Sequence, residues 1–325
     1  STAAPLLPVS VTFTLGGRKG AGEVTIASGG TLTLTGKSGA AVDLDLAMSV
    51  DGTGTTGTGN MNLVGGTFNA TIDVLRMGKQ NGGGGSATGT LSFDAGTVTA
   101  NSVSMGIGSK GIGVINQRGG TFTVSGSMAD GGGSSTVNVY GGTMNVGGSL
   151  TVDTLNVGYN GRVGTVNVNG AVSIGTGSQT LYWGRRDSGD SDSKAVLDFS
   201  AAPSVNVNVT NLNLGTITSG GGQQAWAEVT LSASGPNTIT AASLMLGDST
   251  QAGNTSDPTI LRLGADNTIN AGTFTIAGRK SAAEVKFATA GGVLTLGSQA
   301  DPIDNLRIGY NNVDTGSVNQ GLLNG

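Results

Sequence analysis

Short runs of alternating apolar and polar residues recur along almost the whole chain, and many of these runs end in glycine. Residues 154–158 (TLNVG) form such a run, and two further alternating runs follow at 165–168 (TVNV) and 171–174 (AVSI). A new glycine-terminated run at 180–184 (TLYWG) then starts the cycle again. Alternation places apolar side chains on one side of a strand and polar side chains on the other. The pattern therefore predicts three short β-strands in each repeat, with one side of each strand buried.

The repeat is roughly 29 residues long and occurs about ten times, and its steps of roughly 25–32 residues vary as loops do. Repeats of this length form solenoids, in which each unit buries its apolar side only against its neighbours. We interpret the glycine-terminated runs as equivalent positions of successive repeats. These runs end at Leu15-Gly16, Met77-Gly78, Met105-Gly106, Val157-Gly158, Trp183-Gly184, Leu214-Gly215, Leu246-Gly247, Ala277-Gly278 and Ile308-Gly309.

Glycine pairs separate the second and third runs of several repeats. They occur at 29–30, 65–66, 119–120, 141–142 and 291–292. Because glycine adopts positive φ without a steric penalty, these pairs predict a corner that stacks from repeat to repeat. Residues 13–34 (FTLGGRKGAGEVTIASGGTLTL) and 274–296 (FTIAGRKSAAEVKFATAGGVLTL) also match in the order of their strands, basic residues and corner.

Together these patterns predict an all-β fold, a single-stranded right-handed parallel β-helix (β-solenoid) of about ten coils with three short strands each. The right-handed sense follows the general preference of parallel crossover connections. We expect residues 1–10 to form an extended N-terminal arm and residues 11–325 to form the β-helix, which stays open or continues at its C-terminal end. At about 4.8 Å per coil, ten coils make a rod about 50 Å long.

The composition narrows the range of functions. The 325 residues include 60 Gly but only 6 Pro, which does not fit the collagen repeat. The chain has no Cys and no His, so disulfides, thiol catalysis and the commonest metal ligands are absent. A net charge of −4 and 11% charged residues do not form a basic nucleic-acid footprint, and no apolar run is long enough to span a membrane. We therefore expect no cofactor, no metal, no nucleic-acid partner and no membrane span.

The strands that follow the glycine pairs, 119–124 (GGTFTV) and 141–146 (GGTMNV), and the run 155–158 (LNVG) carry a family resemblance. They resemble the Gly-Gly-Thr-rich β-strand repeats of large bacterial exported proteins, of the autotransporter-passenger type. The resemblance covers nearly the whole chain from about residue 11. It implies an extracellular or bacterial cell-surface β-helix, as in stalks, adhesins and matrix components.

Two groups of charged residues are candidates for chemistry. Asp43 and Asp45 alternate on one side of a strand, and Asp187, Asp190 and Asp192 share one loop. Carboxylate pairs suit acid–base catalysis on polysaccharides, and carboxylate loops suit Ca²⁺, but solvated surfaces contain the same patterns. Basic residues follow the closing glycine of several repeats, which predicts either a ladder of ion pairs along one edge or a stripe that binds acidic glycans. These residues are Arg18, Lys19, Lys79, Lys110, Arg162, Arg185, Arg186, Arg279 and Lys280.

The ends of a β-helix expose unpaired strand edges that need a cap or a partner. We therefore expect apolar residues near both ends to act in assembly, namely Pro5, Leu6, Leu7, Val9, Val318, Leu322 and Leu323. Copies of the chain joined end to end would form a filament, since a head-to-tail contact need not close. The sequence thus predicts a non-enzymatic extracellular structural protein, a surface stalk or a filament protomer whose partners are copies of itself. The alternatives are a glycan-binding adhesin and a polysaccharide-active β-helix enzyme, both with glycans as partners.

Overall fold

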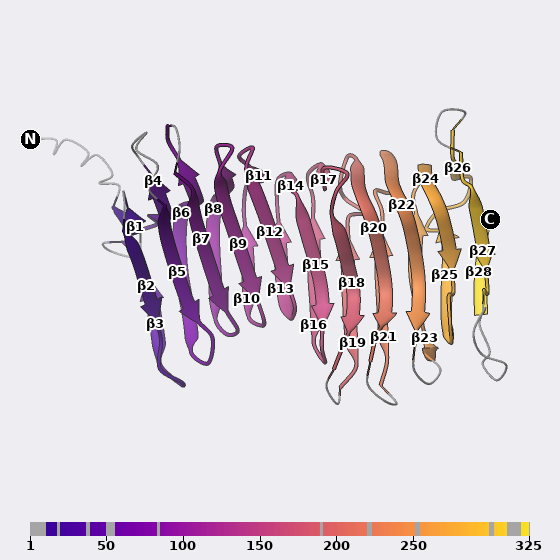
Figure 1. Ribbon diagram of the computed structural model, residues 1–325, viewed down its shortest axis with the longest axis horizontal. Coiled ribbons are helices and arrows are strands. Elements are labelled where there is room, and N and C mark those ends of the chain that lie inside the picture. The colour runs from indigo at the N-terminus through magenta and orange to yellow at the C-terminus, as the bar shows by residue number, and fades with distance from the viewer. Residues whose placement is uncertain are drawn as a thin grey trace, which may run out of the picture.

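The computed structural model describes residues 11–17, 20–36, 40–49, 56–82, 85–188, 191–219, 223–250, 254–298, 302–310 and 320–324. These residues form 28 strands in one continuous sheet, and the strands run across the long axis of an elongated rod (Figure 1). No helix among these residues is long and apolar enough to cross a membrane. The predicted arm, residues 1–10, lies outside the described residues.

The sheet is wound into three ladders, which we call faces A, B and C. Every pairing between strands is parallel, and the described residues contain one isolated antiparallel bridge, between Ile107 and Gly132. Five strands are long enough to bend from one face to the next, and each contributes to two ladders. These are β6 (Thr67–Gln80), β8 (Thr97–Ile107), β20 (Val205–Ile217), β22 (Pro236–Ser249) and β24 (Asp266–Ile276).

The remaining strands each belong to one face. Face A contains β1 (Thr12–Gly17), β4 (Val42–Ser49), β11 (Met128–Asp130), β14 (Leu150–Val152), β17 (Val172–Ile174) and β26 (Val293–Leu296). Face B contains β2 (Ala21–Thr25), β5 (Gly57–Leu63), β7 (Ala87–Phe93), β9 (Gly111–Gln117), β12 (Ser134–Val139), β15 (Thr154–Tyr159), β18 (Thr180–Arg186) and β27 (Asn305–Ile308). Face C contains β3 (Thr31–Leu34), β10 (Thr121–Val124), β13 (Gly142–Val146), β16 (Val163–Val168), β19 (Ser193–Asp198), β21 (Ala225–Thr230), β23 (Asn254–Leu263), β25 (Ser281–Phe287) and β28 (Gln320–Asn324).

The predicted all-β parallel β-helix is confirmed, with eleven strands stacked in each face of the described chain rather than ten. The coils are less uniform than the sequence spacing indicated. On face B the paired residues Thr136 and Thr154 are 18 positions apart, whereas Ala21 and Thr58 are 37 positions apart. The range of 25–32 residues was therefore too narrow, because the shortest coils contain almost no loop and the longest contain large ones. The right-handed sense of the helix stays a prediction.

The interior of the rod is a dry column of apolar side chains. Alternating residues of all three faces point into it, and a chain of aromatic contacts runs along part of its length. Phe93 lies between Phe68 and Phe122, with ring centroids 6.3 Å apart on both sides and edge-to-face geometry. All three rings are fully buried. Each such side chain stabilises the fold by roughly 1.5–3 kcal/mol through removal of apolar surface from water.

The glycine corners are confirmed, but they do not all lie in one column. Gly29, Gly65, Gly120 and Gly142 have positive φ and lie at the corner between faces B and C. Gly291 also has positive φ, but it follows β25 of face C and precedes β26 of face A. The same sequence signal therefore marks two different corners of the rod.

The glycine-terminated runs show the same shift of one face. Leu15, Met77 and Met105 precede their glycines on face A, whereas all the runs from Val157 to Ile308 end on face B. The similar stretches 13–34 and 274–296 likewise begin on face A and face B, respectively. Our interpretation of these runs as equivalent stacked positions was wrong, because the repeat advances by one face across the short coils between β8 and β15.

Candidate functional site

Two of the seven predicted assembly residues lie in the described part of the chain. Leu322 and Leu323 belong to β28, the last strand of face C. Leu322 is 49% exposed, and Leu323 packs against the core with part of its side chain. The other five, Pro5, Leu6, Leu7, Val9 and Val318, lie outside the described residues.

The first and last coils share an unusual exposure of apolar side chains. Strands β1, β2 and β3 pair only with the second coil, and β26, β27 and β28 pair only with the coil before them. Seven of the nine exposed large apolar residues in the described chain belong to these two coils, although the coils are a small part of the rod. These seven are Val11, Phe13, Val293, Leu306, Ile308, Tyr310 and Leu322.

The structure places Asp43 and Asp45 side by side on β4, as predicted. Both accept hydrogen bonds from Arg76 of β6 in the next coil, at 3.2 Å and 3.0 Å from its Nη1. In the Asp loop, Asp187 pairs with Arg185, and Asp192 accepts a hydrogen bond from the backbone N–H of Gln224. Asp190 lies outside the described residues. Among the described residues no group of three Asp or Glu side chains could hold a metal ion.

The predicted basic edge is split between two edges of the rod. Lys79 and Lys110 lie at the end of face A, whereas Arg162, Arg185 and Arg279 lie at the end of face B. The prediction of a single edge was wrong because the repeat shifts by one face between these groups. Two further corrections concern single residues. Arg186 is fully buried, where its Nη2 donates to Oε1 of Gln223, and Arg18 and Lys19 lie outside the described residues.

Tyrosine is confined to one edge of the molecule. The chain contains four tyrosines, Tyr140, Tyr159, Tyr182 and Tyr310. Each lies in or directly after a strand of face B, near its C-terminal end. Three of them come from consecutive coils, on β18, at the end of β15 and directly after β12. Parallel strands of successive coils are about 4.8 Å apart, so these three side chains form a cluster along the rod axis.

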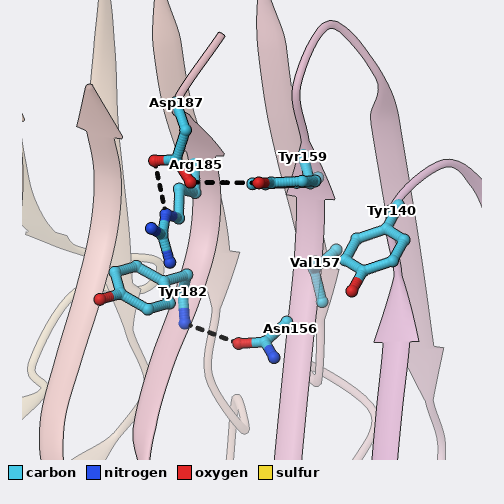
Figure 2. A pocket seen from close by; sticks show the side chains of 8 residues that line it. Tyr140, Asn156, Val157, Tyr159, Tyr182, Arg185 and Asp187 are labelled. Atoms are coloured by element: carbon cyan, nitrogen blue, oxygen red, sulfur yellow. Dashed lines mark hydrogen bonds and ion pairs between the residues drawn. The ribbon is translucent and has the colours of Figure 1, made fainter. Parts of the chain in front are cut away.

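We call this cluster the tyrosine groove and define it by Arg118, Tyr140, Tyr159, Arg162, Tyr182, Arg185 and Asp187. The rings of Tyr140 and Tyr159 are 5.2 Å apart and tilted by 42°. Figure 2 shows Tyr159 and Arg185 directed at Asp187 from neighbouring strands. The Tyr159 hydroxyl donates to Oδ2 of Asp187 at 3.1 Å, and Nε of Arg185 donates to Oδ1 at 2.7 Å. The Arg185 guanidinium also lies 4.0 Å from the centre of the Tyr182 ring, a cation–π contact.

An asparagine ladder supports the floor of the groove. Asn138 donates to Asn116, and Asn156 donates to Asn138, each at 2.9 Å. The ladder ends where Tyr182 occupies the next position, and Oδ1 of Asn156 accepts the backbone N–H of Tyr182 at 3.0 Å. Because each amide fixes the next, the strands that carry the tyrosines are held in register.

The charges of the groove are set by these contacts. Burial opposes ionisation of Asp187, but hydrogen bonds from Arg185, Thr218 and Tyr159 outweigh it and lower the pKa of this carboxyl group. Burial, together with the hydrogen bond to Asp187, raises the pKa of Tyr159. Burial also raises the pKa of Tyr140, although Arg118 and Arg185 act in the opposite direction. At neutral pH the groove therefore contains neutral tyrosines, an ionised Asp187 and three arginines.

Two adjoining hollows make up the groove. One has a volume of about 200 Å³ and lies between Tyr140, Tyr159 and Tyr182, and it is the hollow drawn in Figure 2. The other has a volume of about 280 Å³ and lies between Tyr140, Tyr159, Arg118 and Arg162. Both are smaller than the roughly 300–1,000 Å³ of enclosed small-molecule sites. Shallow neighbouring hollows suit an extended chain molecule better than a single enclosed ligand.

Sequence reasoning identified Arg162, Arg185 and Asp187 but missed the tyrosines and Arg118. A signal was present, since Val157-Gly158-Tyr159 and Ile308-Gly309-Tyr310 repeat the order apolar, glycine, tyrosine. Both tripeptides end a strand of face B, and in the second one Tyr310 lies under the Arg307 guanidinium at 4.6 Å.

Comparison of the chain with protein-family models, curated proteins and solved structures finds no match in any of the three. The architecture is that of a β-solenoid repeat protein, a long all-parallel sheet of many short strands.

Proposed function

We propose that this chain is an extracellular structural protein of a bacterial cell surface, a stalk or filament protomer that assembles head to tail and performs no catalysis. One observation carries the proposal. The exposed large apolar side chains of the described chain are concentrated in the first and last coils, where the strands have a partner on one side only.

The geometry of the two end coils supports association in one orientation. All three ladders are parallel along the rod, so the outer edges of β1, β2 and β3 match those of β26, β27 and β28 in strand direction. A second copy stacked in the same orientation would continue each ladder and cover residues such as Phe13 and Ile308. A contact of this kind joins different surfaces of the two copies, and repetition produces a filament. Unpaired edges of apolar strands favour such pairing.

Engagement of the carboxylates supports a structural rather than an enzymatic role. Asp43 and Asp45 share the guanidinium of Arg76, and Asp187 is paired with Arg185. A general acid or base must be free to exchange a proton with a substrate, and pairing with arginine keeps a carboxylate ionised. The extracellular location is supported by the resemblance of the repeats to those of bacterial exported proteins.

Assembly is tested by sedimentation velocity and negative-stain electron microscopy of the purified chain at several concentrations. We expect end-to-end rods of uniform width whose length increases with concentration. The double variant Ile308→Lys/Leu322→Lys places charges on the last coil and is expected to leave single rods. Val163→Lys is the matched control, because Val163 is 53% exposed in the middle of the rod. Single rods of the unaltered chain, or filaments that persist in the double variant, would contradict the proposal.

A further inference from the structure

The confinement of tyrosine to one edge calls for a physical reason, because fold stability does not supply one. Aromatic residues make up 4% of the chain, and the core uses phenylalanine and Trp183 rather than tyrosine. Tyr140, Tyr159 and Tyr182 are all half-buried, so each presents part of a ring to solvent. A tyrosine ring offers a flat apolar surface with a polar end, the combination that suits a ligand with apolar and hydroxyl groups.

The hydroxyl groups of the groove are available in part. Tyr159 uses its hydroxyl to hold Asp187, whereas the hydroxyls of Tyr140 and Tyr182 have no hydrogen-bond partner among the described residues. Sugar rings have both an apolar C–H side and hydroxyl groups around their edges. The groove therefore has the chemistry to bind a saccharide by ring contact and hydrogen bonding together.

The charge of the groove indicates the class of saccharide. The charge of Arg185 is balanced by Asp187 at 2.7 Å. Arg118 and Arg162 form no ion pair with a carboxylate in the described part of the chain, and Arg162 is held by donating to the backbone carbonyl of Arg118 at 2.9 Å. Two arginines without a carboxylate partner create a positive site on a chain whose net charge is −4. Guanidinium groups pair with carboxylates through two parallel hydrogen bonds.

The groove is also held in one conformation before any ligand arrives. Oδ1 of Asn160 accepts hydrogen bonds from the backbone N–H groups of Asp187 and Ser188, at 2.7 Å and 3.2 Å. Asn160 adopts a positive φ of 44°, a conformation that asparagine tolerates better than most residues. Thr218 donates to Asp187 from the following coil. A rigid site loses little conformational entropy when it binds a ligand.

We propose that the tyrosine groove is a binding site for an acidic polysaccharide, one with carboxylate groups on its sugar rings. The saccharide chain lies along the rod axis, because the hollows follow one another from coil to coil. Its sugar rings contact Tyr140, Tyr159 and Tyr182, and its carboxylates pair with Arg118 and Arg162. The groove lies on the side of the rod, so this binding does not depend on the end-to-end assembly proposed above.

Titration calorimetry with an oligogalacturonate tests the proposal, with a neutral malto-oligosaccharide of equal length and a single-stranded oligonucleotide as comparison probes. We expect the oligogalacturonate to bind with an affinity that falls as salt is raised. The double variant Arg118→Gln/Arg162→Gln should lose at least tenfold in affinity. Tyr140→Leu keeps apolar bulk but loses the flat ring, and it should also lose at least tenfold. Arg262→Gln, on β23 of face C, is the matched control and should bind like the unaltered chain.

The outcomes separate clearly, provided that far-UV circular dichroism shows each variant to be folded. No binding of the oligogalacturonate would overturn the proposal. Equal or stronger binding of the neutral oligosaccharide or of the oligonucleotide would overturn the assignment of an acidic saccharide. Binding that neither the arginine variant nor Tyr140→Leu weakens would show that the ligand lies elsewhere on the rod.

Discussion

The column of positive-φ residues at the end of face B allows a sharp test of how tightly the coils are stacked. Gly158, Gly184, Gly215, Gly247, Ala277 and Gly309 share this conformation from coil to coil. At Gly158, a Cβ atom would overlap the backbone carbonyl of Lys194 on β19. Gly132 has φ of +87° but no atom within 4 Å of the place its Cβ would occupy. The two glycines therefore differ in packing and agree in conformation.

This difference sets the expected magnitudes for Gly158→Ala and Gly132→Ala. An alanine in the left-handed region costs about 1–2 kcal/mol relative to the right-handed one, and this applies at both sites. Alanine also restricts the unfolded chain, which returns about 0.4–1 kcal/mol at both sites. Gly158→Ala must in addition displace a neighbouring strand, which costs about 1–3 kcal/mol. We therefore expect Gly158→Ala to lower the free energy of unfolding by about 1–3 kcal/mol more than Gly132→Ala does.

The measurement is urea denaturation followed by far-UV circular dichroism, with hydrogen exchange to locate the weakened coils. Stability in a solenoid is approximately a sum over neighbouring coils, so the loss should appear as faster exchange in β15, β18 and β19. Equal destabilisation by the two substitutions would refute the reasoning, because it would mean that the backbone of β19 moves away without cost.

Two further predictions concern the core and the acidic groups. Phe93→Ala should lower the free energy of unfolding by about 3–5 kcal/mol, since it opens a cavity between two buried rings, and urea denaturation with Val163→Ala as a surface control would measure this. Asp187→Asn should lower the melting temperature at pH 7, and the gap should close as the pH falls through the lowered pKa of Asp187 in the folded state. Asp153→Asn should instead raise the melting temperature at pH 7, because burial raises the pKa of Asp153 and nearby Asp130 adds to this. This second gap should also close in acid, with the opposite sign, and a gap constant from pH 7 to pH 3 would contradict either prediction.

Local patterns were sufficient to predict the architecture. Alternation of apolar and polar residues, as in Val166 and Asn167 of β16, identified individual strands. Glycine pairs such as Gly141-Gly142 identified corners, because positive φ is a local requirement. The absence of any helical period left the parallel β-helix as the fold that buries such strands.

The advance of the repeat by one face could not be predicted in the same way. All three faces have the same alternation and the same small residues at their ends, so a strand does not encode its face. Only its pairing partners define the face, and these depend on the length of every preceding coil. Coils of about 29 residues would have placed Tyr140, Tyr159 and Tyr182 out of register, since they are 19 and 23 residues apart. The tyrosine groove was therefore invisible until the short coils were known.

These short coils also explain why the groove lies where it does. Between faces B and C, only residues 118–120, 140–141 and 160–162 join the strands of three consecutive coils, whereas residues 187–192 form a longer loop in the next coil. Short connections leave the edge of face B uncovered, so Tyr140 and Tyr159 remain open to solvent. The longer loop closes one side of the groove, because Asp187 at its start is fixed by Arg185 and Tyr159. The change in coil length that shifts the repeat by one face thus also produces a surface on the rod that is open enough to bind a chain molecule.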